Sequence, residues 1–183
     1  TQSFKDTFEE PVNDKKHQGS RSRMQNMVAD KVAEANYLSD ANYLRAAKVA
    51  LMEFPKFKGK TLRVYSDIQF YDDGRVMLNL QDPAIPENID RYTFRDGDWE
   101  EPEPVKLSSQ ADFYQQLLPL DSVDFGTVTA IYGYMTKESA SIEGAEQVNH
   151  IYLIISPHIV GNQWYASLQA ARRTAYVRSF QER

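Results

Sequence analysis

The chain has 183 residues, of which 42% are hydrophobic and 26% charged, a composition typical of a folded globular protein that excludes global disorder. Its net charge of −5 and pI of 5.2 argue against a nucleic-acid-binding protein, which needs a basic surface to displace counterions from phosphates. The absence of cysteine excludes disulfides, thiolate metal ligands and a cysteine nucleophile, and no apolar run approaches the roughly 20 residues of a membrane span.

Residues 1–23 are predicted to form a flexible tether, because they carry charges of both signs and no periodic apolar pattern. The chain begins with Thr1 in place of Met, which is expected of a mature protein from which a secretory signal has been removed. We therefore expect a protein of the bacterial envelope, either periplasmic or held at the outer membrane by an N-terminal lipid anchor. A cytoplasmic protein is the alternative.

A helical pattern extends from Met24 to Phe54. Apolar residues recur there at spacings of three and four, which is the period of one helix face. Ser39-Asp40 offers an N-cap for a second helical stretch, and Pro55 ends the segment. The pattern leaves open whether the segment is one helix or two.

Two β-hairpins are predicted between Leu62 and Val105. Apolar residues alternate with polar ones on both sides of Asp72-Asp73-Gly74, and the pattern recurs around Asp96-Gly97. Alternation interrupted by Asp-Gly is the strongest short-range signal of a hairpin. The acidic, proline-containing segment 100–104 is predicted to lie at a sheet edge, because proline cannot donate to a β-ladder.

The second half of the chain repeats this order of elements. Gln110–Leu118 is predicted as a short helix, and Thr136–Gln147 as a polar loop. Ser122–Met135 fits both a helix face and strand alternation, and we favour a helix because Asp121-Ser122 offers a cap. Three further strands are predicted at Val148–Ile155, Gln163–Ala170 and Arg173–Phe180.

This order predicts an α+β protein with an antiparallel β-meander sheet and helices packed on one face, with two tandem helix-plus-meander units as one arrangement of it. We assign residues 1–23 to the tether, 24–107 to the first unit and 108–183 to the second, packed with the first as one compact body. From Met24 onward, the element order and hairpin turns resemble those of small bacterial envelope lipoproteins and PepSY-like domains. The resemblance implies a binding or inhibitory role and assigns no catalytic residue.

The sequence carries no motif of a catalytic, metal or cofactor site. His17, His150 and His158 are not spaced as metal ligands, and Gly-x-Ser-x-Gly and phosphate-binding glycine loops are missing. Acid pairs such as Asp72-Asp73 lie at predicted hairpin tips, where backbone conformation favours Asp. We therefore predict a non-enzymatic protein without cofactor or metal. A hydrolase-like enzyme whose acids assemble only in the fold is the alternative.

Aromatic and arginine residues gather on the last two predicted strands, where alternate residues project from one face of a sheet. Trp, Tyr and Arg contribute most of the energy at protein interfaces. We predict that this face binds a protein or peptide, and an ordinary solvated face is the alternative. A carrier of a small apolar ligand would need a cavity at Phe70, Leu78 and Ile155, which we expect to be packed core. The predicted binding residues are Trp164, Tyr165, Arg172, Tyr176 and Arg178.

Overall fold

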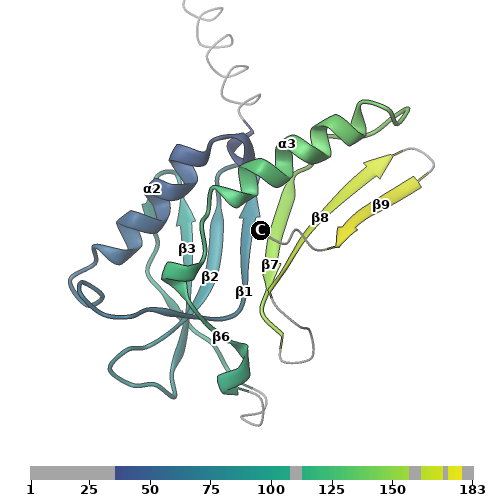
Figure 1. The fold of residues 1–183 in the computed structure, drawn as a ribbon. Helices are drawn as coiled ribbons and strands as arrows, with labels where there is room; N and C mark the ends of the chain where they lie inside the picture. The colour runs from purple at the N-terminus through teal and green to yellow at the C-terminus, as the bar shows by residue number, and fades with distance from the viewer. Residues whose placement is uncertain (1–35, 108–112, 157–161, 171–172, 179–183) are drawn as a thin grey trace, which may run out of the picture. The chain divides into compact units, whose positions relative to one another are not determined.

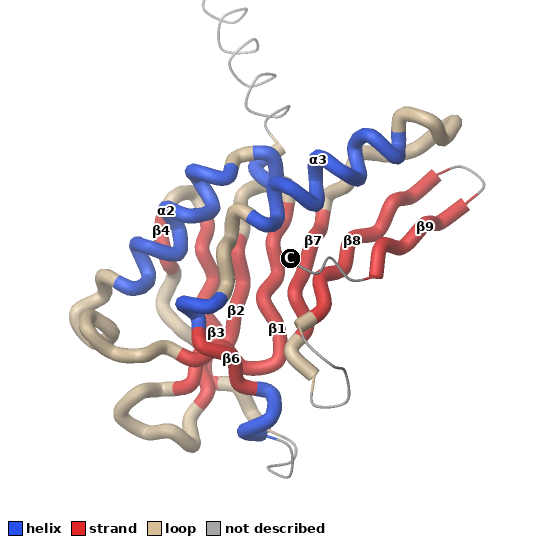
Figure 2. The backbone as a smooth tube through the Cα atoms, in the orientation of Figure 1, coloured by secondary structure: helices blue, strands red, loops and turns tan. Residues whose placement is uncertain are grey.

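The computed structural model describes residues 36–107, 113–156, 162–170 and 173–178, and from Asn36 onward the chain forms one compact unit. The tether predicted for residues 1–23 and the first part of the helical segment, residues 24–35, lie outside the described residues. The fold is α+β, with an open antiparallel sheet and two long helices across one of its faces (Figures 1 and 2).

The helices are the 3-10 turns η1 (Tyr37–Ser39), η2 (Phe113–Gln116) and η3 (Leu120–Ser122), and the α-helices α2 (Ala41–Met52) and α3 (Thr127–Ser139). The strands are β1 (Arg63–Tyr71), β2 (Val76–Gln81), β3 (Ile89–Arg95), β4 (Asp98–Trp99), β5 (Glu103–Pro104), β6 (Leu117–Pro119), β7 (His150–Ile154), β8 (Gln163–Ala170) and β9 (Arg173–Arg178). Among the described helices, none has the length and apolar character that crossing a bilayer requires.

The strand order is β4-β3-β2-β1-β7-β8-β9, with β5 paired to β3 and β6 paired to β1. β1 and β7 are the first long strands after α2 and α3, and they pair antiparallel at the centre of the sheet. Each half then runs outward by hairpins to its own edge. Among the described residues, the two halves therefore repeat one order, a helix followed by three long strands, and they share a single sheet.

α2 begins at a side-chain cap, as the sequence predicted. The Asp40 carboxylate accepts a hydrogen bond from the backbone N–H of Tyr43 at 2.9 Å, and the Asp40 backbone is not helical. α2 is therefore a separate helix from the 3-10 turn before it. Its core face consists of Leu44, Ala47 and Leu51, at the spacing of three and four residues that the sequence showed.

Both predicted hairpin turns are confirmed, and each uses glycine at positive φ. In the first, Gly74 has a φ of +89° and its N–H donates to the carbonyl of Tyr71 at 3.1 Å, which closes a three-residue loop. In the second, Asp96 and Gly97 have φ values of 52° and 88°. Positive φ at both central residues is the requirement of the type I′ turn, whose twist matches that of paired strands.

Three predictions for the second half need correction. The predicted helix at Ser122–Met135 exists but begins at Thr127. The predicted cap, Asp121-Ser122, does not precede it directly. Instead, the Asp124 carboxylate accepts a hydrogen bond from the N–H of Gly126 at 2.8 Å and orders the turn before the helix. α3 also continues to Ser139, into the predicted loop. In Gln110–Leu118 the described residues form the turn η2 and strand β6, because residues 117–119 pair with β1.

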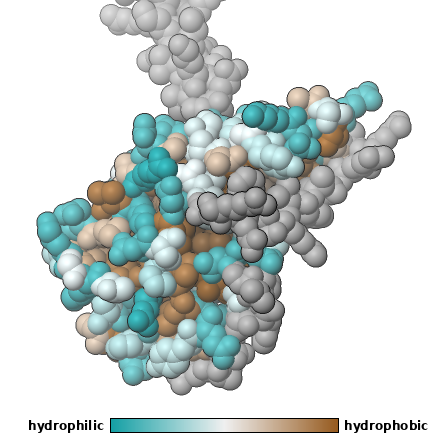
Figure 3. Space-filling view, in the orientation of Figure 1, coloured by the Kyte–Doolittle hydropathy of each residue, from teal (hydrophilic) through white to brown (hydrophobic). Residues whose placement is uncertain are grey.

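The core lies between the sheet and the two helices. The Phe70 ring packs edge-on against Phe125 at 4.9 Å and beside Trp164 at 5.9 Å. Leu78 and Ile155 belong to the same buried cluster, so the residues that an apolar ligand cavity would need are packed core, as expected. Figure 3 shows the helix-bearing side, where brown hydrophobic residues gather beside α2 among teal polar ones.

Candidate functional site

The sheet face opposite α2 and α3, which we call the open face, carries the side chains that alternate with the core residues. Within the described ranges, both long helices lie on the other face (Figure 1). At one end of the open face, the ring of Phe113 packs against Tyr65 at 5.4 Å. The open-face residues are Asp67, Gln69 and Tyr71 on β1, Met77 and Asn79 on β2, Arg91, Thr93 and Arg95 on β3, His150, Tyr152 and Ile154 on β7, and Gln163, Tyr165 and Ser167 on β8.

Four rings on this face form a continuous stack, which we call the aromatic ladder. The rings of Tyr71 and His150 lie 4.5 Å apart at 7°, those of His150 and Tyr152 4.9 Å apart at 23°, and those of Tyr152 and Tyr165 5.2 Å apart at 11°. The pairing of strands explains the stack. Tyr71 is paired with His150 across β1 and β7, and Tyr152 with Tyr165 across β7 and β8.

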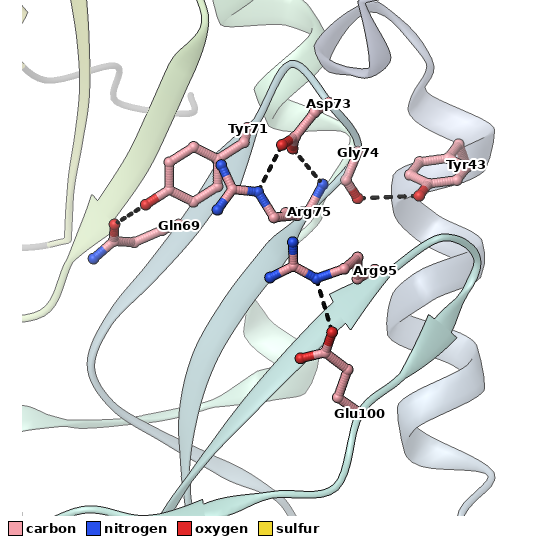
Figure 4. A network of polar contacts seen from close by, with 8 residues as sticks. All are labelled: Tyr43, Gln69, Tyr71, Asp73, Gly74, Arg75, Arg95 and Glu100. Atoms are coloured by element: carbon pink, nitrogen blue, oxygen red, sulfur yellow. Dashed lines mark hydrogen bonds and ion pairs between the residues drawn. The ribbon is translucent and has the colours of Figure 1, made fainter. Parts of the chain in front are cut away.

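Polar contacts hold the ladder at both ends. The Tyr71 hydroxyl donates to Gln69 Oε1 at 2.8 Å, and the Tyr165 hydroxyl donates to Gln163 Oε1 at 2.7 Å. The guanidinium of Arg75 lies 4.3 Å from the centre of the Tyr71 ring, within the range of a cation–π contact (Figure 4). The rings are therefore ordered by their neighbours before any partner binds.

His150 occupies the inside of the ladder as a neutral ring. Burial lowers the pKa of His150 below its usual value, the positive charge of Arg75 lowers it further, and Asp67 raises it. Its Nε2 atom is buried and has no hydrogen-bond partner among the described residues. An uncharged imidazole stacks between two tyrosine rings without the cost of burying a cation.

Two arginines, Arg75 directly before β2 and Arg95 at the end of β3, lie beside the ladder; we call them the arginine pair. Arg75 Nε contacts the Asp73 carboxylate at 2.7 Å, and Arg95 Nε contacts Glu100 at 2.8 Å (Figure 4). The register of β2 and β3 pairs Val76 with Phe94, which places Arg75 opposite Arg95 one residue further along. Each arginine is thus held by an acid that belongs to its own hairpin.

The structure separates the residues that the sequence grouped as a binding site. Tyr165 is half-buried on the open face, within the ladder. Trp164 is 7% exposed and belongs to the core, because its neighbours at a spacing of two, Ala166 and Leu168, face the helices. Trp164 therefore does not lie on the open face, which corrects the expectation that it joins Tyr165 there.

Of the other three predicted binding residues, the structure gives the strand register of two, Tyr176 and Arg178. In the β8–β9 register, Arg178 is paired with Tyr165 and Tyr176 with Ser167, so both lie opposite open-face residues of β8. Arg172 lies outside the described residues.

Three ladder residues were not predicted as site residues. Tyr71, His150 and Tyr152 are not among the predicted binding residues, and His150 is considered above only as a metal ligand. Alternation places Gln69 with Tyr71, and Gln163 with Tyr165, on one face of their own strands, but it is the pairing of β1, β7 and β8 that brings the rings together.

Within the described ranges, no three His, Asp or Glu side chains lie close enough together to hold a metal ion. Comparisons with protein-family models, with curated proteins and with solved structures found no match to this chain.

Proposed function

We propose that this is a non-enzymatic binding protein whose open face binds a protein or a peptide. The aromatic ladder is the observation that carries the proposal. Tyrosine offers a large contact area with few rotatable bonds, and here stacking and two hydrogen bonds already restrict the rings. A partner that lies on the ladder therefore loses little affinity to the ordering of these side chains.

The geometry of the ladder favours a polypeptide over a sugar or a base. Sugars and bases bind tyrosine by stacking on an open ring face, but the inner rings, His150 and Tyr152, have both faces covered by their ladder neighbours. What these two rings present to a partner is their edges. Ring edges carry the positive end of the aromatic quadrupole and suit carbonyl oxygens, which a polypeptide backbone supplies along its whole length.

Site-specific photocrosslinking in the native host tests this proposal. A photoreactive residue at Thr93 or at Ser167 samples the open face without removing a ladder ring, and the same residue at Lys137 on α3 samples the opposite side. We expect a defined crosslinked adduct from Thr93 and Ser167 and none from Lys137. Equal adducts at all three positions, or none on the open face, would contradict the proposal.

We further propose that the protein acts in the bacterial envelope, as the polar composition of residues 1–23 and the resemblance to envelope lipoproteins favour. Fractionation of the native host, combined with the intact mass of the native protein, tests this. An unmodified protein in the cytoplasmic fraction would contradict it. Of the alternatives, an apolar-ligand carrier is disfavoured because Phe70, Leu78 and Ile155 pack in the core.

A further inference from the structure

We propose that the arginine pair binds a carboxylate side chain of the partner, so that the segment lying on the open face is acidic at one end. This inference rests on the proposed function and names the chemistry of its partner. It concerns Arg75 and Arg95, neither of which belongs to the aromatic ladder.

Each guanidinium group is oriented by an ion pair but keeps N–H donors that this ion pair does not engage. A guanidinium carries five N–H groups, and in each arginine the ion pair within its own hairpin engages Nε, to Asp73 in one case and to Glu100 in the other. These contacts leave the two terminal nitrogens of each group for further acceptors, as Figure 4 shows. A guanidinium held in place through Nε loses less freedom when a carboxylate binds its terminal nitrogens.

The positions of the two charges also favour an anion. Like charges directly opposite each other on paired strands destabilise a sheet. Asp73 and Glu100 offset this repulsion only in part, because their side chains are 51% and 48% exposed and water screens them. A carboxylate that accepts from both guanidinium groups would supply a shared counter-charge with bidentate geometry.

The register connects this anion site to the ladder. β1 pairs Phe70 with Val76 on one side and Tyr71 with His150 on the other. Extending the pairings by one residue therefore gives a single row across four strands: Arg95, Arg75, Tyr71 and His150. The ladder then continues to β8. At about 4.8 Å per strand, the distance from β3 to β8 is about 19 Å, which an extended segment of about six residues spans.

The expected partner segment thus has an acidic residue at one end and aromatic or apolar residues after it. A suitable probe is a fluorescein-labelled, C-terminally amidated peptide with two glutamates followed by alternating tyrosine and threonine. Its matched partner has glutamine in place of both glutamates. Fluorescence anisotropy at low ionic strength measures the affinity of the full chain for each peptide.

We expect the glutamate peptide to bind about tenfold more tightly than the glutamine peptide. Arg95→Gln should remove most of this difference, whereas Arg95→Lys should retain part of it, because lysine keeps the charge but not the bidentate geometry. Arg45→Gln is the matched control. It removes an arginine of similar exposure, 53% against 48%, that is also ion-paired to an acid but lies on α2.

Equal affinities for the two peptides, or no binding of either, would overturn the carboxylate site. So would an Arg45→Gln effect as large as that of Arg95→Gln, since the attraction would then reflect overall charge. The crosslinks at Thr93 and Ser167 separate the two proposals. If the crosslinks persist while the two peptides bind equally, the open face still binds a partner but the acidic segment is wrong. If the crosslinks are also absent, the proposed function is contradicted.

Discussion

Replacing Gly74 by alanine is expected to destabilise the protein by about 3 kcal/mol, about twice the effect of the same change at Gly97. Both glycines lie in hairpin turns, and their φ values are almost equal, +89° and +88°. An L-residue at such a φ costs roughly 1–2 kcal/mol, and this cost applies to both positions. The two sites differ in what the new methyl group would meet.

At Gly97 nothing lies within 4 Å of an added Cβ, so the backbone cost is the whole effect. At Gly74 the Cβ would come within 2.7 Å of the Tyr43 hydroxyl and 3.1 Å of the Tyr37 ring. Moving Tyr43 away breaks the hydrogen bond that its hydroxyl donates to the Gly74 carbonyl at 3.0 Å, a net loss of roughly 0.5–1.5 kcal/mol. Overpacking against the two rings adds about 1 kcal/mol or more.

Urea denaturation followed by circular dichroism measures the two changes in free energy of unfolding, and thermal unfolding measures the corresponding changes in Tm. At roughly 2–4 °C per kcal/mol for a chain of this size, Gly74→Ala should lower the Tm by about 6–12 °C and Gly97→Ala by about half as much. Tyr43→Phe removes the atom that the methyl group meets first, so the cost of Gly74→Ala should fall in that background. Equal costs at Gly74 and Gly97, or no relief in the Tyr43→Phe background, would refute the reasoning.

Two further perturbations follow from contacts of the helices. The hydrogen bond from Arg45 holds the pKa of Asp124 at about 2, below its value of 3.8 in the unfolded chain. The ionised Asp124 carboxylate therefore stabilises the fold above pH 3.8, and this stabilisation is lost as the pH falls toward 2. Asp124→Asn should therefore flatten the decline in Tm over that interval, and an unchanged acid profile would contradict the assignment. Trp99 Nε1 donates to a carbonyl of α2 at 2.9 Å, so Trp99→Phe should cost about 1 kcal/mol and Trp99→Ala about 3–5 kcal/mol in urea denaturation. Similar costs for the two Trp99 variants would show that the side chain is not packed as described.

The hairpins were predictable because their signals are local. Asp-Gly pairs fix the backbone of a turn within two or three residues, and the flanking alternation fixes which side chains face the core. The start of α3 was not predictable in the same way. Asp121-Ser122 matches a cap in sequence, but β6 pairs with β1 just before it and carries the chain into a 3-10 turn first.

The aromatic ladder lay beyond local reasoning because it depends on which strands pair. Tyr71 and His150 are far apart in the sequence, and no local pattern indicates that β1 pairs with β7. The inward position of Trp164, in contrast, could have been inferred, since Trp164, Ala166 and Leu168 form the apolar half of an alternating strand whose other half contains Tyr165.

The central pairing of β1 with β7 has a consequence for the order in which the protein folds. The meander of β1, β2 and β3 consists of strands that are neighbours in sequence, so it can form early. The pairing of β1 with β7 can form only after most of the chain has been synthesised. During that interval residues 67–71 of β1, which later pair with β7, present an unpaired edge, and such an edge is a template for association with other chains. Nascent protein stalled after the first half should therefore need a chaperone more than the finished chain does.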